Sequence, residues 1–323
     1  MEQETGVTAD PVASIVVPSF RGADRLPQLL DSLAAQQEGT PPFEVIVVLD
    51  GVDGGSVALL ENETRLDLRS IVFPENRGRV TALNAGFEVA RGGVLIRCDD
   101  DLIVPPGYVA AHVEAQTSSG TVGVVGPTRD IHAPSAYARA YGEDAARKSL
   151  AHVLSRPPQE RWRLWAASCS ITRGTWESVG RYDDRYQGYG WEDIDYGYRL
   201  HAAGIPIQVV EALMAEHHGP ARTARARSLK AFEAGGARST FRRLHPEASI
   251  GDPATGNGVW GLGVRLTAAS MRSRRAVERV AALIDRMLPI VPRPVGRKLV
   301  ALAVEGAGVA GASHSVDEER RAR

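Results

Sequence analysis

The chain contains 323 residues, of which 43% are apolar and 24% are charged. These values exclude a disordered chain and indicate a globular protein long enough for one large α/β domain with an extension. The formal net charge is -1, but basic residues gather in the C-terminal third, from Arg222 to Arg243 and from Arg265 to Lys298. They are expected on solvated helix faces, or facing an anionic partner such as a phospholipid surface or a phosphorylated acceptor.

The first residues, MEQETGVTADP, are polar and acidic, and we expect a flexible N-terminus over residues 1–11. They lack the basic start and apolar core of a signal peptide. No run of the sequence reaches the roughly 18 to 20 apolar residues that a membrane span needs. Cys98 and Cys169 lie far apart in apolar segments. We therefore expect reduced thiols without a catalytic role and a cytoplasmic protein, with peripheral contact at the inner face of the membrane left open.

Short runs rich in β-branched residues recur along the first half of the chain, at residues 13–20, 43–50, 68–75, 93–100 and 121–128. Helical patterns separate the first four runs, at residues 24–37, 56–63 and 79–91. Strands that alternate with helices at this spacing form a mostly parallel sheet covered on both faces. The sequence therefore predicts an α/β fold with a Rossmann-like, mostly parallel sheet flanked by helices.

Polar residues follow the predicted strands. Pro18 and Ser19 end the first strand, Asp50 ends the second, Arg77 and Arg79 follow the third, and three aspartates follow the fourth. Ligands of parallel sheets bind beyond the carboxyl ends of the strands, so this edge is the expected binding site. The G-x-G-x-x-G fingerprint is absent after the first strand, which argues against a nicotinamide-dependent enzyme.

The stretch VLIRCDDDLIVPPG, residues 94–107, places Asp99, Asp100 and Asp101 between two apolar segments. Adjacent carboxylates repel one another, so this arrangement needs compensating positive charge or full solvation. Residues i and i+2 of an extended turn can direct two carboxylates toward one hard cation. A divalent cation site and a solvated acidic turn are the two interpretations.

Five segments occur in a fixed order over about residues 12–220: VVPSF, VIVVLDG, ENRGRVTALNAGFEVARG, LIRCDDDLIVPPG and YGWEDIDYGYRLHAAG. In this order and these strand contexts, the chain resembles the family 2 glycosyltransferases. The resemblance implies an inverting enzyme of the GT-A fold that uses a nucleotide-sugar donor, with its catalytic domain over residues 12–220.

The resemblance also implies a metal site. The D-x-D motif of the family falls on Asp99 and Asp101, with Asp100 between them, and we group Asp99 and Asp100 with the donor contacts. Mn²⁺ or Mg²⁺ bound there would bridge the diphosphate of the donor. One histidine of the tandem pair His217 and His218 is implied as a further metal ligand, and we favour His217.

Residues of the donor site are implied at three other strand ends. Asp50 would hold the base or ribose together with Pro18 and Ser19, and its alternative role is that of a turn former. Arg77 or Arg79 would contact the diphosphate or the base near a helix N-terminus, where phosphates bind readily. The alternative for each arginine is a solvated surface position.

The segment YGWEDIDYGYRLHAAG is implied to supply the catalytic base. Glu192 and Asp193 fall on the first turn of a predicted helix, where capping is the alternative role. An inverting transfer needs one carboxylate to take the proton of the acceptor hydroxyl, and the resemblance assigns it to Asp193, with Glu192 as second candidate. Asp195 is expected to be structural. Trp191 and Tyr189 can stack on a sugar ring, with core packing as the alternative for Trp191.

Outside these motifs the patterns are weaker. Residues 129–164 are predicted to form a loop-rich insertion on the acceptor side. Residues 221–312 are predicted to form a mainly helical C-terminal extension, which either packs on the catalytic domain or lies on a membrane surface. Residues 313–323 are predicted to be a flexible tail.

Three classes of function remain at this stage. A metal-dependent inverting glycosyltransferase is favoured, acting on a glycan or lipid-linked acceptor in glycan, polysaccharide or glycolipid biosynthesis and without a nucleic-acid partner. A sugar-nucleotide nucleotidyltransferase shares the sheet and the acidic ligands, but PSFRGADRLP is a poor triphosphate loop. A non-catalytic nucleotide-sugar binder would not need the Glu192–Asp193 pair. Donor sugar, nucleobase, linkage and oligomeric state are left open by the sequence.

Overall fold

The computed structural model of the chain describes residues 10–186, 188–248, 250–251 and 258–322. The predicted flexible N-terminus lies almost wholly outside the described residues, which begin at Asp10. The chain divides into two compact units. The first unit comprises Met1–Thr128, Val153–Tyr182 and Tyr196–His217, and the second comprises Arg129–His152, Asp183–Asp195 and His218–Arg323.

A seven-stranded sheet forms the centre of the first unit, in the order β3-β2-β1-β4-β8-β6-β9. β1 is parallel to β2 and β4, β2 is parallel to β3, and β6 is parallel to β9, whereas β8 is antiparallel to β4 and β6. This confirms the predicted mostly parallel sheet. The strands are β1 Ala13–Ser19, β2 Phe43–Leu49, β3 Leu68–Val72, β4 Val94–Cys98, β6 Gly123–Val125, β8 Ser168–Thr172 and β9 Ile207–Val209.

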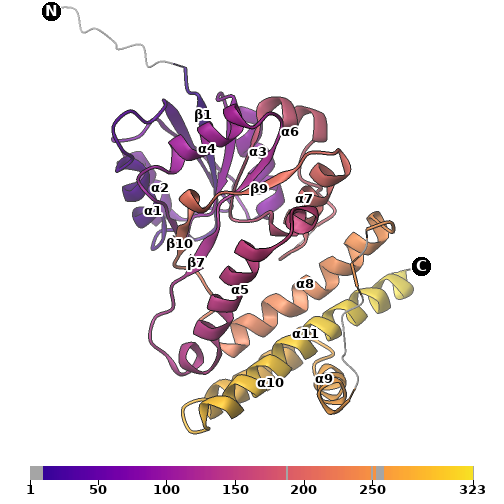
Figure 1. Cartoon of the computed structure of the whole chain (residues 1–323). Coiled ribbons are helices and arrows are strands. Elements are labelled where there is room, and N and C mark those ends of the chain that lie inside the picture. Colours follow the sequence, from indigo (N-terminus) through magenta and orange to yellow (C-terminus); the bar gives the residue numbers. More distant parts are fainter. Residues whose placement is uncertain (1–9, 187, 249, 252–257, 323) are drawn as a thin grey trace, which may run out of the picture. The chain divides into compact units, whose positions relative to one another are not determined.

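Helices cover both faces of this sheet (Figure 1). Ile15 of β1 is fully buried in a cluster with Leu30 of α1 and Tyr108 of α4. On the other face, Gly86 of α3 packs so tightly that a Cβ there would lie 2.3 Å from Val16 Cγ1, so only glycine fits. The helices of this unit are α1 Leu26–Ala34, α2 Gly54–Glu61, α3 Arg79–Val89, α4 Tyr108–Ser118 and α6 Arg173–Val179, with the 3-10 turns Pro158–Leu164 and Glu211–Leu213.

A smaller three-stranded sheet has the order β5-β10-β7. Its strands are β5 Leu102–Ile103, β10 Ala215–His217 and β7 Thr128–Asp130. β10 runs antiparallel to β5, with His217 opposite Leu102. This pairing joins the end of the first unit to the segment that directly follows the aspartate triplet.

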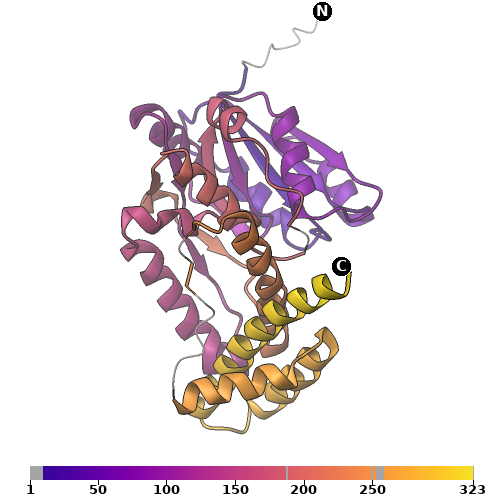
Figure 2. The same cartoon turned by 90° about the vertical axis from the view of Figure 1, so that its right-hand side faces the viewer.

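Helices dominate the second unit: α8 Ala224–Leu244, α9 Val259–Ser270, α10 Arg274–Met287 and α11 Arg293–Ala322. Figures 1 and 2 show α11 lying along α8. Glycines allow this close approach, because a Cβ on Gly235 of α8 would lie 2.2 Å from the Gly308 carbonyl oxygen of α11. The structure confirms the predicted C-terminal helices. Residues 313–322, predicted to be a tail, continue α11.

The prediction of a loop-rich segment at residues 129–164 is wrong. A π-helical turn covers Ala138–Gly142, α5 covers Glu143–Ser155, and the 3-10 turn Pro158–Leu164 follows. None of the α5 residues is buried, and Leu150, Val153 and Leu154 are its few large apolar residues, so the helical pattern in the sequence is weak. Its Ala, Arg, Lys and Leu content and the acidic residues of its first turn favour the helix instead.

α7, Glu192–Ala202, begins where the sequence predicted a helix start. No helix in the described residues is both long enough and apolar enough to cross a membrane.

Candidate active site

The carboxyl ends of β1 and β2 lie side by side in the first unit. Ser19 ends β1 opposite Leu49, and the Asp50 N–H donates to the Ser19 carbonyl oxygen at 2.7 Å. The Ser19 hydroxyl donates to Asp100 Oδ2 at 2.6 Å. Pro18, Ser19, Asp50 and Asp100 therefore come together at one edge of the sheet, as expected from their positions after the strands.

Asp50 shapes the loop that leads into α3. Its buried carboxylate accepts the backbone N–H of Arg77 at 2.6 Å and that of Gly78 at 2.9 Å. Gly78 has φ = 91°, a conformation that glycine adopts readily, and Arg79 opens the helix. The Arg77 guanidinium lies 4.9 Å from the centroid of the Phe73 ring. Asp50 thus sets the backbone from which both candidate phosphate-binding arginines project.

Asp99 is balanced by positive charge. Arg97, which is 1% exposed, donates to Asp99 Oδ1 from Nε at 2.9 Å. Burial opposes ionisation, but the charges of Arg97, Arg79 and His217 outweigh it and lower the pKa of Asp99 below its usual value. The carboxylate is therefore held ionised beside the arginine that opens α3.

Asp100 has different partners from Asp99. Arg25 donates to both of its oxygens, at 3.0 Å from Nε and 2.7 Å from Nη2, and Ser19 adds a third hydrogen bond. Burial nevertheless raises the pKa of Asp100, with Arg25 and Ser19 offsetting part of the effect. Asp100 ties β4 to the segment after β1, and its carboxylate is directed at Arg25 and Ser19.

Asp101 faces β10. His217 Nε2 lies 3.3 Å from Asp101 Oδ2, because the β5–β10 pairing places His217 opposite the residue that follows Asp101. Asp101 Oδ1 is buried and has no hydrogen-bond partner among the described residues. His218, the next residue, belongs to the second unit and is half-buried. The structure therefore brings Asp101 together with His217, the favoured member of the histidine pair.

Within the described residues, protein side chains alone do not form a complete metal site. In the described part of the chain, no group of three or more His, Cys, Asp or Glu side chains is arranged to hold a metal ion. The Asp101–His217 pair offers one oxygen and one imidazole nitrogen, both suitable ligands for Mn²⁺. A cation there would need further ligands, and diphosphate oxygens are the usual ones for Mg²⁺ and Mn²⁺.

The segment before α7 belongs to the second unit and has unusual backbone angles. Gly188 and Gly190 have φ values of 86° and 96°, and Trp191 has φ = 70°, which costs an L-residue about 1–2 kcal/mol. The Trp191 ring lies 5.1 Å from that of Phe241, and Lys230 Nζ lies 5.1 Å from the Tyr189 centroid. Both aromatic rings thus contact α8. For Trp191 this contact agrees with core packing, the alternative to stacking on a sugar ring.

The carboxylates at the start of α7 differ in exposure. Glu192 is 2% exposed, whereas Asp193 is half-buried and so within reach of a ligand. Asp195 is fully buried, accepts the Tyr186 hydroxyl at 3.2 Å and lies 2.7 Å from His245 Nε2. Asp195 therefore anchors the start of α7 within the second unit, in keeping with its expected structural role.

Several site residues were missed at the sequence level. Arg97 could have been found, because side chains two apart on a strand share a face and a lone arginine in VLIRC stands two residues before Asp99. Arg25 and His245 gave no such signal. Their partners, Asp100 and Asp195, are distant in sequence and meet them only through the tertiary fold.

The mostly parallel sheet, its flanking helices and the polar strand ends define the fold as one of the GT-A type. A mannosyltransferase from Pyrobaculum calidifontis, solved in complex with GDP-Man and Mn2+, superimposes with a TM-score of 0.60 at 19% identity, over 97% of this chain and 89% of that one. At this identity the likeness shows the fold.

Residues 14–139 match the family described as Glycosyl transferase family 2. Validoxylamine A glucosyltransferase of Streptomyces hygroscopicus subsp. jinggangensis is 30% identical over 226 residues, which are 62% of this chain and 53% of that protein. An undecaprenyl-phosphate 4-deoxy-4-formamido-L-arabinose transferase of Pseudomonas fluorescens is 35% identical over 130 residues, covering 39% and 38% of the two chains. The chain thus spans about half the length, or less, of these curated relatives.

Proposed function

We propose that the protein is a metal-dependent, inverting glycosyltransferase that moves a sugar from a nucleoside-diphosphate sugar to an acceptor hydroxyl, in glycan, polysaccharide or glycolipid biosynthesis. The observation that carries the proposal is the Asp101–His217 pair, which lies beside the ionised Asp99 within a family 2 fold. The solved relative with GDP-Man and Mn2+ supports this class of donor and cofactor.

The residues present fit a bound Mn²⁺ or Mg²⁺. Asp101 keeps a buried oxygen without a hydrogen-bond partner in the described residues, and His217 offers a neutral imidazole when deprotonated. In the proposal Asp101 and His217 hold the cation, with Asp99 or His218 as further candidate ligands. When bound, the cation would neutralise charge on the departing nucleoside diphosphate.

The donor side of the proposal uses the first unit. Arg79, and Arg77 beside it, would bind the diphosphate, supported by their position at the N-terminal end of α3. Asp50 would act by holding the Arg77–Gly78 backbone while the edge formed by Pro18 and Ser19 receives the nucleoside. Asp100 would contribute by fixing this edge through Ser19.

The acceptor side uses residues of the second unit. Asp193 would take the proton of the attacking hydroxyl at a carboxylate oxygen, and its partial exposure supports it over the buried Glu192. Tyr189 and Trp191 are the proposed contacts for the acceptor sugar. The names of the relatives give validoxylamine A in one case and undecaprenyl phosphate in another, and we propose a glycan or a lipid-linked acceptor for this chain.

The test is a panel of nucleotide sugars with Mn²⁺, followed by melting temperature and then by product analysis. A true donor should raise the melting temperature, because a ligand that binds only the folded state stabilises it by mass action. Transfer with inverted anomeric configuration, determined by NMR of the product, would support the full proposal. Release of pyrophosphate from a nucleoside triphosphate and a sugar phosphate would indicate a nucleotidyltransferase instead, and binding without any transfer would indicate a binding protein.

A further inference from the structure

Exposed apolar side chains concentrate in the C-terminal helices of the second unit. Of the thirteen large apolar side chains exposed in the described residues, seven lie between residues 258 and 300. On α9, Val259, Leu262 and Leu266 are 90%, 52% and 63% exposed. Their spacing of three and four residues places them on one side of the helix, whereas Val264 and Ala268 are buried. We call these three exposed residues the α9 face. It is an apolar surface that the described chain does not cover.

Basic residues predominate in the segment that contains the α9 face. Residues 258–300 contain nine arginine and lysine residues but only Glu278 and Asp285 as acids, although the whole chain has a net charge of -1. Asp285 accepts the backbone N–H groups of Ala224 and Arg225, so its charge is engaged inside the unit. This segment is therefore basic as well as apolar, although Glu305 of α11 accepts a hydrogen bond from Trp260 Nε1 at 2.9 Å.

A basic hollow of about 410 Å³ lies next to the tryptophan of α9. It is lined by Tyr141, Asp144, Ala145, Lys148, Trp260, Arg297, Lys298 and Ala301. Asp144 contacts Arg147 at 2.5 Å, Arg293 at 3.4 Å and Arg297 at 3.5 Å. Among the lining residues, Lys148, Arg297 and Lys298 are basic and Asp144 alone is acidic, so the hollow carries an excess of positive charge.

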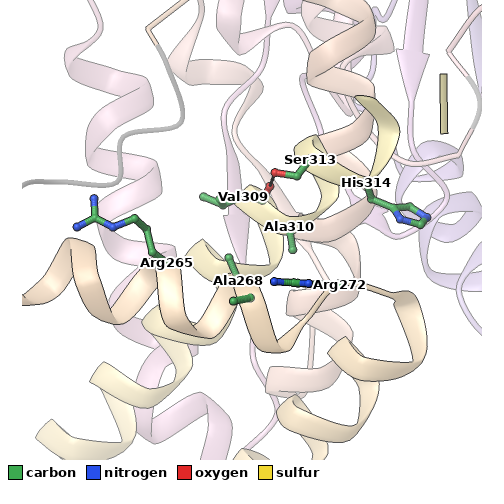
Figure 3. A pocket seen from close by; sticks show the side chains of 8 residues that line it. Arg265, Ala268, Arg272, Val309, Ala310, Ser313 and His314 are labelled. Carbon is green, nitrogen blue, oxygen red and sulfur yellow. Dashed lines mark hydrogen bonds between the residues drawn. The ribbon is translucent and has the colours of Figure 1, made fainter. Parts of the chain in front are cut away.

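A second hollow, of about 380 Å³, lies between α9 and α11 (Figure 3). Arg265 of α9, Arg272 of the connection that follows α9, and His314 of α11 line it, together with Ala268 and Ala310. This hollow thus adds Arg265 and Arg272 to the basic residues of this part of the second unit.

We propose that the α9 face and the basic hollow together form a docking site for an anionic phospholipid bilayer. The three apolar side chains enter the interfacial layer, and the cations of the hollow bind lipid phosphates, the combination that interfacial amphipathic helices use. Trp260 is 38% exposed, and aromatic residues favour the boundary between water and lipid. This inference concerns where the protein works and is independent of the proposed sugar transfer.

Two other occupants fit the surface less well. A second copy of the chain would bring like-charged basic faces together in a symmetric contact, which is unfavourable. A nucleic acid would satisfy the cations but would leave Val259, Leu262 and Leu266 in water. An anionic lipid surface matches both the charge and the apolar side chains.

The experiment is co-sedimentation of the full chain with vesicles of phosphatidylcholine alone or mixed with phosphatidylglycerol. We expect binding to the mixed vesicles that weakens as salt is added, and little binding to phosphatidylcholine. The double variant Leu262→Asp/Leu266→Asp should lower binding by about tenfold or more, and Arg297→Gln/Lys298→Gln by about tenfold.

Matched controls change the same chemistry elsewhere. Val89→Asp alters an apolar side chain that is 41% exposed at the end of α3, and Arg65→Gln/Arg185→Gln removes two charges that are 53% and 65% exposed. Both controls should bind vesicles like the wild type. Circular dichroism and melting temperature of every variant show that it is folded.

Several outcomes would overturn the proposal. The first is equal binding of the wild type to both kinds of vesicle, and the second is unchanged binding by the folded Leu262→Asp/Leu266→Asp variant. The third is a wild-type dimer in solution that does not bind vesicles and that this double substitution dissociates. Stabilisation by inorganic phosphate without vesicle binding would reduce the hollow to an ion site and would also refute lipid docking. None of these outcomes depends on glycosyl transfer, so they leave the proposed function to its own test.

Discussion

The three aspartates after β4 have different surroundings although they are adjacent in sequence. Asp99 is paired with Arg97, Asp100 is paired with Arg25, and Asp101 meets His217 while keeping one buried oxygen without a hydrogen-bond partner among the described residues. Arginines paired with Asp99 and Asp100 thus reduce the repulsion between the three carboxylates. Asp101 is the residue best placed to receive an added cation.

Replacing Asp101 by Asn should therefore remove Mn²⁺-dependent binding of nucleoside diphosphate while the fold is retained. A neutral amide is a poor ligand for a cation that also holds a diphosphate, and we expect affinity to fall by about tenfold or more. Titration calorimetry with and without Mn²⁺ measures this loss. Asp100→Asn is the comparison: it breaks the contact with Arg25 and should instead lower the stability by about 1–3 kcal/mol. Unchanged diphosphate affinity in Asp101→Asn would refute the metal assignment.

His112 offers a prediction about pH. This residue of α4 is fully buried, its Nδ1 lies 2.9 Å from the Ser170 hydroxyl, and burial lowers its pKa from 6.5 to about 3. Between these values the unfolded chain binds a proton that the folded chain does not, so stability falls as the pH is lowered through this range. From about pH 7 to about pH 5 the loss attributable to His112 is about 2 kcal/mol.

The measurement is denaturant unfolding of wild type and His112→Gln at both pH values. The variant should lose less stability on acidification, by about the stated amount. His152→Gln, at an exposed position of α5, is the control and should retain the wild-type pH dependence. Equal pH dependence in wild type and His112→Gln would show that another group is responsible.

Among the elements, α3 and the helical pair α8–α11 depend on small residues. The entry to α3 needs Gly78 at φ = 91°, and Gly86 lets this helix approach β1. α8 and α11 meet through glycines, since a Cβ on Gly311 would lie 1.9 Å from the Phe232 carbonyl oxygen. Asp50 also fixes the start of α3, because its carboxylate accepts two backbone N–H groups of the loop before this helix.

Two glycine-to-alanine changes should have opposite effects on stability. Gly235→Ala in α8 forces a Cβ against the backbone of α11 and should destabilise the protein by about 1–3 kcal/mol. Gly174→Ala in α6 meets no atom within 4 Å, so it should be neutral or stabilise by up to about 1 kcal/mol, as alanine favours helix. Thermal or denaturant unfolding distinguishes them. A neutral Gly235→Ala would contradict the close packing of α8 on α11.

At the scale of the whole molecule, the proposed activity draws on both units. The candidate metal and donor residues Asp99, Asp101 and His217 belong to the first unit, whereas the candidate base Asp193 belongs to the second. Binding of the donor and transfer of the sugar are therefore separable by substitution. The proposed lipid-docking surface adds a third property that belongs to the second unit alone.

Asp193→Asn tests this separation. The change keeps the shape of the side chain but removes proton acceptance, so donor binding should persist while turnover falls about 10²-fold to 10⁴-fold. If Asp193 only caps α7, asparagine replaces it well and turnover stays near that of the wild type. Transfer rate, donor affinity and melting temperature are measured on the same variant. Normal turnover would shift the role to Glu192, and normal turnover in Glu192→Gln as well would leave the inverting mechanism without its base.

The sequence by itself determined the alternation of strands and helices, the strand ends that carry polar residues, and the start of α7. These features are local, because about ten consecutive residues are enough to show the periodicity of a strand or helix and the residue types of a turn. The same local signal failed at residues 138–164, where no α5 residue is buried and large apolar residues are few. The sequence also predicted a flexible tail from residue 313 onward, although α11 runs to Ala322.

Only the tertiary structure decided which partner each carboxylate has. Asp100 meets Arg25, Asp101 meets His217, and Asp195 meets His245, each through strand or helix packing between segments far apart in the chain. It also decided that Trp191 packs on Phe241 and that the α9 face stays exposed. Such choices depend on burial and on the register of β5 with β10, which no local pattern encodes, because they arise only when distant segments are brought into contact.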